Sequence, residues 1–355
     1  MKRRIFALLL VLVICLSIAG CSSEQEGMIY LYGEAHGVPA IMDLELELWQ
    51  KHYHEDGMRH LFTEHSYFTA EFLNLWMQAA DDTILLQIYD NWEGTTAQTE
   101  ATLDFYRAIK ETCPKTVFHG TDVGHQYWNT GEQYLAYLEE SGMTDSEEYQ
   151  RTLEAIEQGK SFYCNGLGSS NADHIYRENT MAENFIREYE ALDGKSIMGI
   201  YGTAHVLLDS LNHTGECDSM GKQLAAHFGE IITSEDLTPR AQAEAKPERV
   251  ETLEFNGKSY EAEYFGLRQL SASYYGYSQV EFWRLVDAYE SFSKADFTGS
   301  ILGESSWPMV IEEGGAYVVQ YTYPDGRTIR QYHLCDGTAM QGVLVTSEVY
   351  SNKIR

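Results

Sequence analysis

The sequence predicts an α/β fold, in which a mostly parallel central sheet is flanked by helices and followed by a small β-rich C-terminal unit. Over residues 28–235, five short apolar segments alternate with helical patterns, an order typical of parallel sheets. One of these segments, 196–201, is a continuous apolar run, as expected for a strand covered on both faces. After residue 250 the sequence pattern changes, and residue pairs typical of turns, such as Asn256-Gly257, indicate hairpins.

The helices and strands of the first part are predicted from the spacing of apolar residues and from the glycine and proline residues that mark the ends of these elements. A glycine turn follows the first strand and leads to Pro39, which suits the first turn of a helix. Cys113-Pro114 ends the helical patterns that fill residues 80–112. Strands are expected at about 28–32, 58–63, 115–119, 196–201 and 230–233. Helices are expected from residue 39 and at about 69–79, 80–112, 134–140, 146–158, 173–189 and 219–228.

The second part is predicted from its turns. Residues 236–250 have the composition of a linker, which sets the α/β domain at 28–235 and the β-rich domain at 251–355. Asn256-Gly257 and the turn at 323–326 each predict a hairpin. A single helix is expected at about 279–292.

The chain begins like a bacterial lipoprotein. Basic residues 2–4 precede an apolar run over 5–18 that is too short to span a membrane comfortably. Ile18-Ala19-Gly20-Cys21 resembles a lipobox, in which Cys21 carries fatty-acyl groups such as palmitate and becomes the mature N-terminus. We therefore expect a signal peptide over 1–21, a tether over 22–27 and an extracytoplasmic protein anchored by lipid to the bacterial cell membrane. An ordinary secretory signal is the alternative.

Charge and cysteine content narrow the class of protein further. The formal charge of −29 repels nucleic acid, so no nucleic-acid partner is expected. The cysteines beyond Cys21 form no Cys-x-x-Cys pair, which disfavours a zinc–thiolate site. Outside the cytoplasm a disulfide can persist, and Cys164 with Cys217 is the first pair to test. Free cysteines are the alternative.

Polar residues gather at the predicted carboxyl ends of four strands, where ligands bind in open α/β sheets. They are Glu34, His36, Glu64, His65, His119, Asp122 and His205. The pattern Gly-x-x-His occurs in two of these turns, at 33–36 and at 202–205. Each residue alone has an ordinary structural explanation, but ionisable groups from several loops at one rim favour a functional site.

These motifs, in this order, resemble a superfamily that includes erythromycin esterases, ChaN-like haem-binding lipoproteins and the Tiki/TraB metalloproteases. The resemblance rests on Gly33-Glu34-Ala35-His36, Glu64, Gly120-Thr121-Asp122, the stretch from Arg177 to Asn184, and Gly202-Thr203-Ala204-His205. It covers about residues 28–235, and the part beyond residue 250 matches no family.

The resemblance implies a sheet flanked by helices with a cleft at the strand ends. Carried over by position, the reacting residues are Glu34, His36, Glu64 and His205, with Arg177 as a charge stabiliser. Esterase members use a histidine and a carboxylate to activate water. Tiki/TraB members use both Gly-x-x-His histidines and the glutamates as metal ligands, here His36, His205, Glu34 and Glu64. Gly-Glu-Ala-His is one residue shorter than the usual esterase spacing between glutamate and histidine, which favours the ChaN or Tiki/TraB side.

The leading hypothesis is a membrane-anchored hydrolase of an ester or amide bond. A divalent metal such as zinc or manganese would suit these ligands and would acidify a bound water. Without metal, the same groups provide a general base and its orienting acid. Asp122 and His119 are expected to contact a small-molecule or peptide substrate. The alternative is a lipoprotein that binds haem or a small ligand without catalysis, and a degenerate scaffold is a third possibility.

Overall fold

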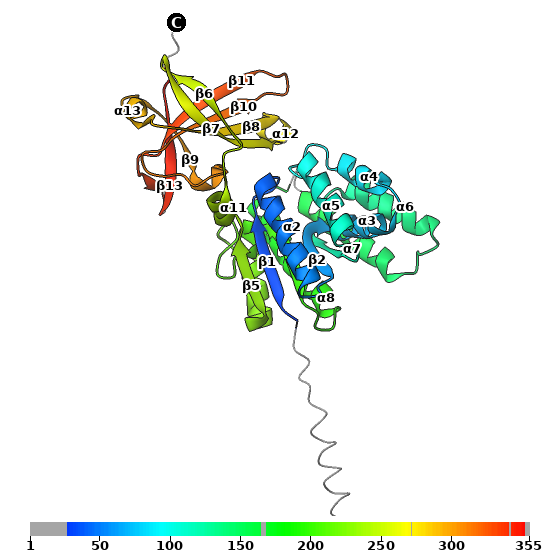
Figure 1. The fold of residues 1–355 in the computed structure, drawn as a ribbon. Helices are drawn as coiled ribbons and strands as arrows, with labels where there is room; N and C mark the ends of the chain where they lie inside the picture. Colours follow the sequence, from blue (N-terminus) through cyan, green and yellow to red (C-terminus); the bar gives the residue numbers. More distant parts are fainter. Residues whose placement is uncertain (1–26, 165–167, 271, 341, 352–355) are drawn as a thin grey trace, which may run out of the picture.

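The computed structural model describes residues 27–164, 168–270, 272–340 and 342–351. The expected signal peptide, Cys21 and nearly all of the tether lie outside the described residues. Figure 1 shows a helix-flanked sheet joined through the short helix α11 (Thr238–Glu244) to a second, β-rich part. The predicted fold class is confirmed.

The first sheet consists of five parallel strands in the order β3-β2-β4-β1-β5. The strands are β1 (Ile29–Glu34), β2 (His60–Ser66), β3 (Val117–Asp122), β4 (Ile197–Gly202) and β5 (Ile232–Asp236). Each of the five predicted strands is present and extends further at its carboxyl end than the sequence pattern indicated. β4 lies between β1 and β2, and the register pairs Glu34 with Gly202. The carboxyl ends of these strands therefore form one rim.

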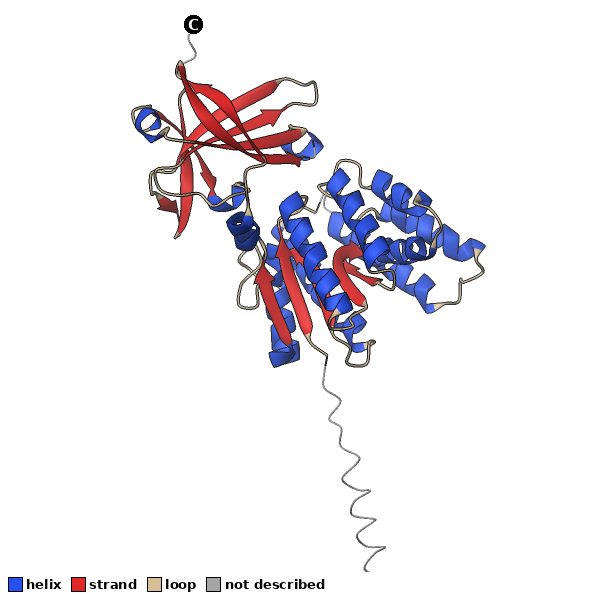
Figure 2. Ribbon diagram, viewed as in Figure 1, coloured by secondary structure: helices blue, strands red, loops and turns tan. Residues whose placement is uncertain are grey.

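Helices cover both faces of this sheet (Figure 2). On one face, Trp49 and Trp76 are fully buried in a core that the sheet shares with the helices between β1 and β3. On the other face, Phe185 and Tyr201 belong to a smaller core. The helices of the first face are α2 (Pro39–His54), α3 (Tyr67–Gln78), α4 (Thr83–Asn91) and α5 (Glu100–Thr112). The later elements are η1 (Tyr127–Gly131), α6 (Glu132–Glu140), α7 (Glu147–Tyr163), α8 (Asn171–Glu190), α9 (Thr203–Val206), α10 (Met220–Phe228) and η2 (Gly229–Ile231).

Helix α8 is the element that brings charge to the rim, and its start is well defined. Ser170 and Asp173 form a reciprocal capping box that satisfies two backbone N–H groups. Met181, Phe185 and Tyr189 bury one side of the helix against the sheet. Arg177 and Glu178 lie about two turns after the cap, so their height above the sheet is fixed by both the cap and the core.

The second part is an antiparallel sheet in the order β12-β13-β11-β10-β8-β7-β6, with β9 paired to β13. As predicted, Asn256 and Gly257 make a two-residue hairpin turn with positive φ, and a turn at 323–326 joins β10 to β11. Its strands are β6 (Arg249–Phe255), β7 (Lys258–Gln269), β8 (Gln279–Leu285), β9 (Phe297–Gly303), β10 (Ala316–Thr322), β11 (Thr328–Leu334), β12 (Ala339–Met340) and β13 (Val343–Val349). Short helical turns between them are α12 (Ala272–Tyr275), α13 (Tyr289–Phe292) and η3 (Glu304–Ser306).

The prediction of a helix at 279–292 is wrong. Residues Gln279–Leu285 form strand β8, and only Tyr289–Phe292 is helical. Both faces of β8 are buried, with Val280 and Phe282 in one core and Trp283 and Leu285 in the other. Apolar residues on both faces break the period-two alternation of a half-exposed strand, and the result imitates a helical pattern.

Two further expectations concern the linker and the cysteines. The region 236–250 contains helix α11, and the buried side chain of Gln242 donates to the carbonyl oxygens of Glu304 and Trp307, 2.9 Å away in each case. Cys164 and Cys217 are free, so the disulfide considered above is not formed. Among the described residues, no helix has the length and hydropathy needed to cross a membrane.

Candidate active site

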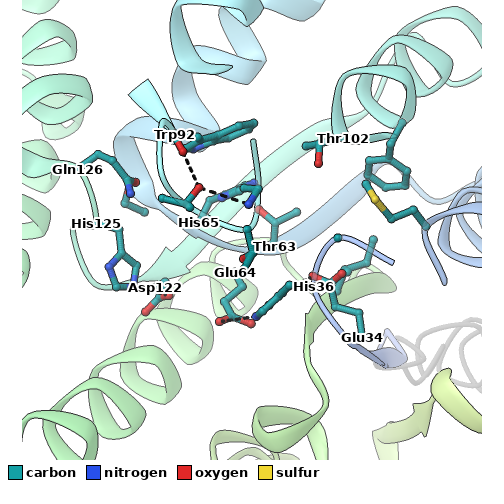
Figure 3. Close-up of a pocket in the computed structure, with 18 of the residues that line it drawn as sticks. Glu34, His36, Thr63, Glu64, His65, Trp92, Thr102, Asp122, His125 and Gln126 are labelled. Carbon is teal, nitrogen blue, oxygen red and sulfur yellow. Dashed lines mark hydrogen bonds and ion pairs between the residues drawn. The ribbon is translucent and has the colours of Figure 1, made fainter. Parts of the chain in front are cut away.

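A cleft of about 300 Å³ opens at the carboxyl ends of the parallel strands (Figure 3). β1 contributes Glu34, and the turn that follows contributes His36 before Gly37, whose φ of +70° suits glycine. β2 contributes Glu64, and β3 contributes Asp122. Helix α8 contributes Arg177. The structure thus brings together residues that the sequence placed on separate loops.

His36 is held between two glutamates. Its Nδ1 donates to Oε1 of Glu34 at 2.9 Å, and its Nε2 lies 3.6 Å from Oε1 of Glu64. The side chain of His36 is 43% exposed, whereas that of Glu64 is only 10% exposed. The imidazole therefore has one face towards solvent and the cleft, and its orientation is set by Glu34.

An ion cluster of Arg177 with two carboxylates forms the floor of the cleft. Nη2 of Arg177 donates to Glu64 Oε1 and to Asp122 Oδ2, both at 2.6 Å, and its Nε donates to Asp122 Oδ1 at 3.0 Å. The other oxygen of Glu64 accepts the backbone N–H of Gly202 at 2.5 Å. The remaining guanidinium nitrogen, Nη1, makes a single weak contact, 3.5 Å from Nε2 of His205. This nitrogen is the donor that remains for a ligand.

His205 lies beside Glu64 in the cluster and is not among the residues that line the cleft. Its Nε2 lies 3.7 Å from Glu64 Oε1, and its Nδ1 is hydrogen-bonded to Glu178 at 2.9 Å. Glu178 is buried and also accepts the backbone N–H of Met220 at the start of α10. Glu178 therefore fixes the ring through Nδ1, while Nε2 lies near Glu64 without a hydrogen bond to it. Sequence reasoning passed over Glu178 as a site residue, although it lies next to Arg177 in the same motif.

The charges of this cluster determine its protonation states. Burial alone would raise the pKa of Glu64, but His36, His205 and Arg177 outweigh it and lower that pKa to about 2. Burial likewise opposes ionisation of Asp122, yet Arg177 and His125 hold its pKa below the usual range. For His205, burial lowers the pKa and Glu64 with Glu178 raises it, with a net increase. Glu64, Asp122 and Arg177 therefore form a network of ionised groups at neutral pH.

The pKa of His36 is also raised. Burial favours the neutral imidazole, but the carboxylates of Glu64 and Glu34 outweigh it and favour the imidazolium. Because 43% of the side chain is exposed, solvent screens part of this attraction. A basic His36 in a carboxylate environment is a group that takes up a proton readily.

The upper wall of the cleft is aromatic. His65 stacks on Trp92 with the ring centroids 5.2 Å apart, and its Nε2 is 2.6 Å from the hydroxyl of Tyr106. Burial lowers the pKa of His65 to about 4, which leaves it neutral. Phe105 lines the same wall. The wall therefore offers apolar and stacking surface to a ligand whose polar end meets the charged floor.

Sequence reasoning missed two further residues at the cleft, His125 and Glu45. His125 donates to Asp122 and contacts the hydroxyl of Tyr163, at 3.1 and 2.5 Å. Glu45 is buried in helix α2, has an oxygen without a hydrogen-bond partner and lines the cleft. Burial and the charge of Glu34 raise the pKa of Glu45 well above its usual value. Glu45 gave no signal in the sequence, because it lies within an ordinary helical pattern.

His119 does not belong to the cleft, contrary to the prediction. β3 continues to Asp122, so His119 lies within the strand and not after it. Its ring stacks on Phe62 and is hydrogen-bonded to His60 and Glu188 on the face of the sheet that α8 covers. Burial lowers the pKa of His119 to about 4. Side chains alternate between faces along a strand, and the predicted strand end was three residues too early.

The donor set does not fit a divalent metal or haem. The guanidinium of Arg177 occupies the space between Glu64 and Asp122, and both oxygens of Glu64 already accept hydrogen bonds. Among the described residues, no group of three or more His, Cys, Asp and Glu side chains is arranged to hold a metal ion. The two tyrosines that line the cleft, Tyr106 and Tyr163, are hydrogen-bonded to histidines rather than free to ligate haem iron.

No protein-family model matches the sequence, and neither does any curated protein. Solved structures with a similar fold include a mutant of the erythromycin esterase EreC in its open conformation (12% identity, 59% of this chain and 70% of that one, TM-score 0.43). A protein from Bacillus cereus is 15% identical over 92% of this chain and 91% of its own, with a TM-score of 0.46. A succinoglycan biosynthesis protein is 13% identical over 66% and 70%, with a TM-score of 0.43. The neighbours thus include an erythromycin esterase, one of the families that the sequence motifs resemble.

Proposed function

We propose that this protein is a lipid-anchored, extracytoplasmic hydrolase that cleaves an ester or amide bond without a metal ion. The observation that carries the proposal is the cleft itself. A solvent-facing histidine oriented by a glutamate lies at the edge of a buried, ionised cluster of Glu64, Arg177 and Asp122. The arrangement combines a base, its orienting acid and a fixed positive charge within one small cavity.

The chemistry follows from the roles that the geometry allows. Glu34 fixes the His36 ring through Nδ1, so Nε2 is the nitrogen that takes the proton from an attacking water. As water adds to the substrate carbonyl, negative charge develops on its oxygen. We assign the stabilisation of that charge to Nη1 of Arg177, the least engaged donor of the cluster. The imidazolium of His36 then returns its proton to the leaving alkoxide or amine.

The size and lining of the cleft indicate the kind of substrate. About 300 Å³ lies at the lower end of the range for small-molecule sites. Trp92, Phe105 and Tyr106 provide an aromatic wall opposite the charged floor. We infer a small substrate with an apolar part next to the scissile carbonyl.

The test is hydrolysis of a panel of small aryl and alkyl esters and amides by the purified protein. His36→Ala should lower kcat/KM by about a hundredfold or more, while circular dichroism and the unfolding midpoint stay close to those of the original protein. His227→Ala is a matched control, because His227 lies on the surface of α10, and it should keep full activity. Equal hydrolysis by the His36→Ala variant would refute the proposal.

Metal analysis separates the two hydrolytic routes and the binding alternative. We expect substoichiometric metal and activity that persists after treatment with a chelator. Stoichiometric zinc or manganese with loss of activity on chelation would support the metal-dependent route instead. A red protein with bound haem and no hydrolysis would support the ligand-binding lipoprotein.

Membrane anchoring is tested separately. A diacylated Cys21 holds a protein firmly to a bilayer. One acyl chain alone binds the membrane weakly, and the binding free energy of a second chain adds to it. The protein should therefore fractionate with membranes, and Cys21→Ala should release it or block its processing. Unmodified Cys21 in a soluble mature protein would contradict this.

A further inference from the structure

A second cavity, of about 130 Å³, lies between the two domains and away from the cleft floor. One side is formed by Val38, Pro39 and Ile41 at the start of α2 and by Ala241 of α11. The opposite side is formed by Phe265 and Phe282 of the β-rich domain. Figure 1 shows α11 at this junction, between the helix-flanked sheet and the second sheet.

The size and walls of the cavity fit one small ring. An engineered protein cavity of about 150 Å³ with apolar walls stays dry and takes up benzene. The present cavity is slightly smaller, and its lining combines apolar side chains with polar ones, which include Gln242, Glu248 and Ser306. Its walls alone would not distinguish a ligand from empty space.

Two polar groups at the cavity favour a bound ligand over empty space. Nε1 of Trp307 and Nε of Arg268 are buried and have no hydrogen-bond partner. Trp307 is 2% exposed, and both residues line the cavity. An indole N–H and a guanidinium N–H can only donate, so the missing partner must be an acceptor. Among the described residues, the ionisable groups that act on the charge of Arg268 are Tyr275 and Tyr321 rather than an acid, which favours an anionic acceptor.

We propose that this cavity binds a small carboxylate that carries a single ring, of the size of benzoate. The ring would fill the apolar space between Phe265, Phe282 and Ala241. The carboxylate oxygens would accept the two unpaired N–H groups of Trp307 and Arg268. A buried donor without a partner destabilises the folded state, so a ligand that supplies an acceptor removes that penalty.

The position of the cavity gives this site a direct connection to the cleft. Ala35, which lines the cavity, lies between Glu34 and His36 in the sequence. Val38 and Pro39, which begin helix α2, continue the same turn. A ligand here therefore contacts the backbone segment that carries the general base. The inference does not depend on hydrolysis, because binding can be measured alone.

The experiment measures binding of benzoate to the purified protein by calorimetry and by ligand-observed NMR. Benzoate should bind, and the neutral isostere benzamide should bind at least about tenfold more weakly. Trp307→Phe removes the donor and keeps the ring, and Arg268→Met removes the charge. Each should weaken benzoate at least about tenfold. Ala40→Trp, at an exposed position on the cavity edge, should block binding without disturbing the core.

Two controls locate the ligand. Arg327→Met, at a surface arginine of the β10–β11 turn, should leave binding unchanged. His36→Ala should also leave it unchanged, because His36 belongs to the cleft. Loss of binding in His36→Ala with retention in Trp307→Phe would place benzoate in the cleft and overturn the proposal. Absence of benzoate binding, or binding indifferent to Trp307→Phe and Ala40→Trp, would overturn it as well.

Discussion

At the scale of single residues, the protonation of His36 decides when the cleft can act as a base. The carboxylates of Glu64 and Glu34 outweigh burial and raise its pKa, so the neutral imidazole becomes more abundant as pH rises. For a base that must be neutral, kcat/KM should increase through the alkaline range, about tenfold per pH unit below the pKa. Glu34→Gln removes one of the two charges and should move this limb to lower pH. A pH profile identical in both proteins would contradict the assignment.

The buried ion cluster makes a prediction about stability. Asp122→Ala leaves the guanidinium of Arg177 with one carboxylate fewer, and loss of one partner from a buried pair costs about 3–5 kcal/mol. Urea unfolding at neutral pH measures this change. Because the folded pKa of Asp122 lies below its ordinary value, the contribution is present above about pH 4 and is lost as pH falls through the folded pKa. Asp325→Ala, at an exposed surface pair, should change the unfolding free energy little.

Glu45 predicts the opposite dependence on pH. Burial raises its pKa in the folded state, so the folded protein keeps a proton that the unfolded chain releases. Stability should therefore fall as pH rises above about 4.3, the ordinary value for glutamate. Glu45→Gln keeps the shape and removes this titration. It should be more stable than the original protein by about 1–3 kcal/mol at about pH 8, with little difference near pH 4. An equal difference at both pH values would show that Glu45 is not protonated on folding.

These residues also show how much of the candidate site could be predicted from the sequence. Glu34, His36, Glu64 and His205 could be predicted because each ends an apolar segment that reads clearly as a strand. His119 was misplaced because a strand end is uncertain by a few residues, and three residues change the face to which a side chain points. Glu45 and His125 could not be predicted, because their place at the cleft depends on how helices and loops fold over the sheet.

At the scale of elements, the loop after β3 is held by close contact between two glycines. A Cβ on Gly159 of α7 would lie 2.1 Å from the carbonyl oxygen of Gly124, and one on Gly124 would lie 2.0 Å from that of Ala155. Within a helix, alanine is normally favoured over glycine by about 0.5–1 kcal/mol. Here the clash should dominate, so Gly159→Ala should destabilise the protein by about 1–3 kcal/mol.

The same change should reach the cleft, because the loop continues to His125, which is hydrogen-bonded to Asp122. Thermal unfolding and the hydrolysis assay measure the two effects. Gly303→Ala is the matched control, since a Cβ there meets nothing within 4 Å, and it should be close to neutral. If Gly159→Ala is neutral too, α7 and the loop after β3 are less tightly packed than described.

Elements with one buried face could be predicted more reliably than elements with two. Helix α8 has an apolar side and a capping box, and its predicted range of 173–189 lies within the observed Asn171–Glu190. β8 is buried by a different core on each face, so its pattern lost the alternation that identifies a strand. Its identity depends on the neighbouring strands β7 and β10, which the local sequence does not contain.

At the scale of the whole molecule, Gln242 fastens the two domains together. Its amide donates to the carbonyl oxygens of Glu304 and Trp307, and its side chain is buried. Gln242→Ala leaves both carbonyls without this donor and should loosen the junction. Limited proteolysis should then cut faster within 244–249, between α11 and β6. Gln223→Ala, at a half-buried position of α10 away from the junction, should not change the cutting rate. Unchanged cutting in Gln242→Ala would show that other contacts hold the junction.

The position of β4 between β1 and β2 has a consequence for how the protein folds. The two strands formed first in the chain do not neighbour each other, and each pairs with β4. The central sheet therefore cannot close until β4 has emerged, and closure brings together segments that are far apart in the chain. Until then, the edges of β1 and β2 that later pair with β4 leave backbone N–H and C=O groups unpaired, and such edges associate readily with other chains. Folding of this domain should be slow compared with a helical protein of equal length, and the charged rim should assemble in the last step, when Glu64 meets the N–H of Gly202.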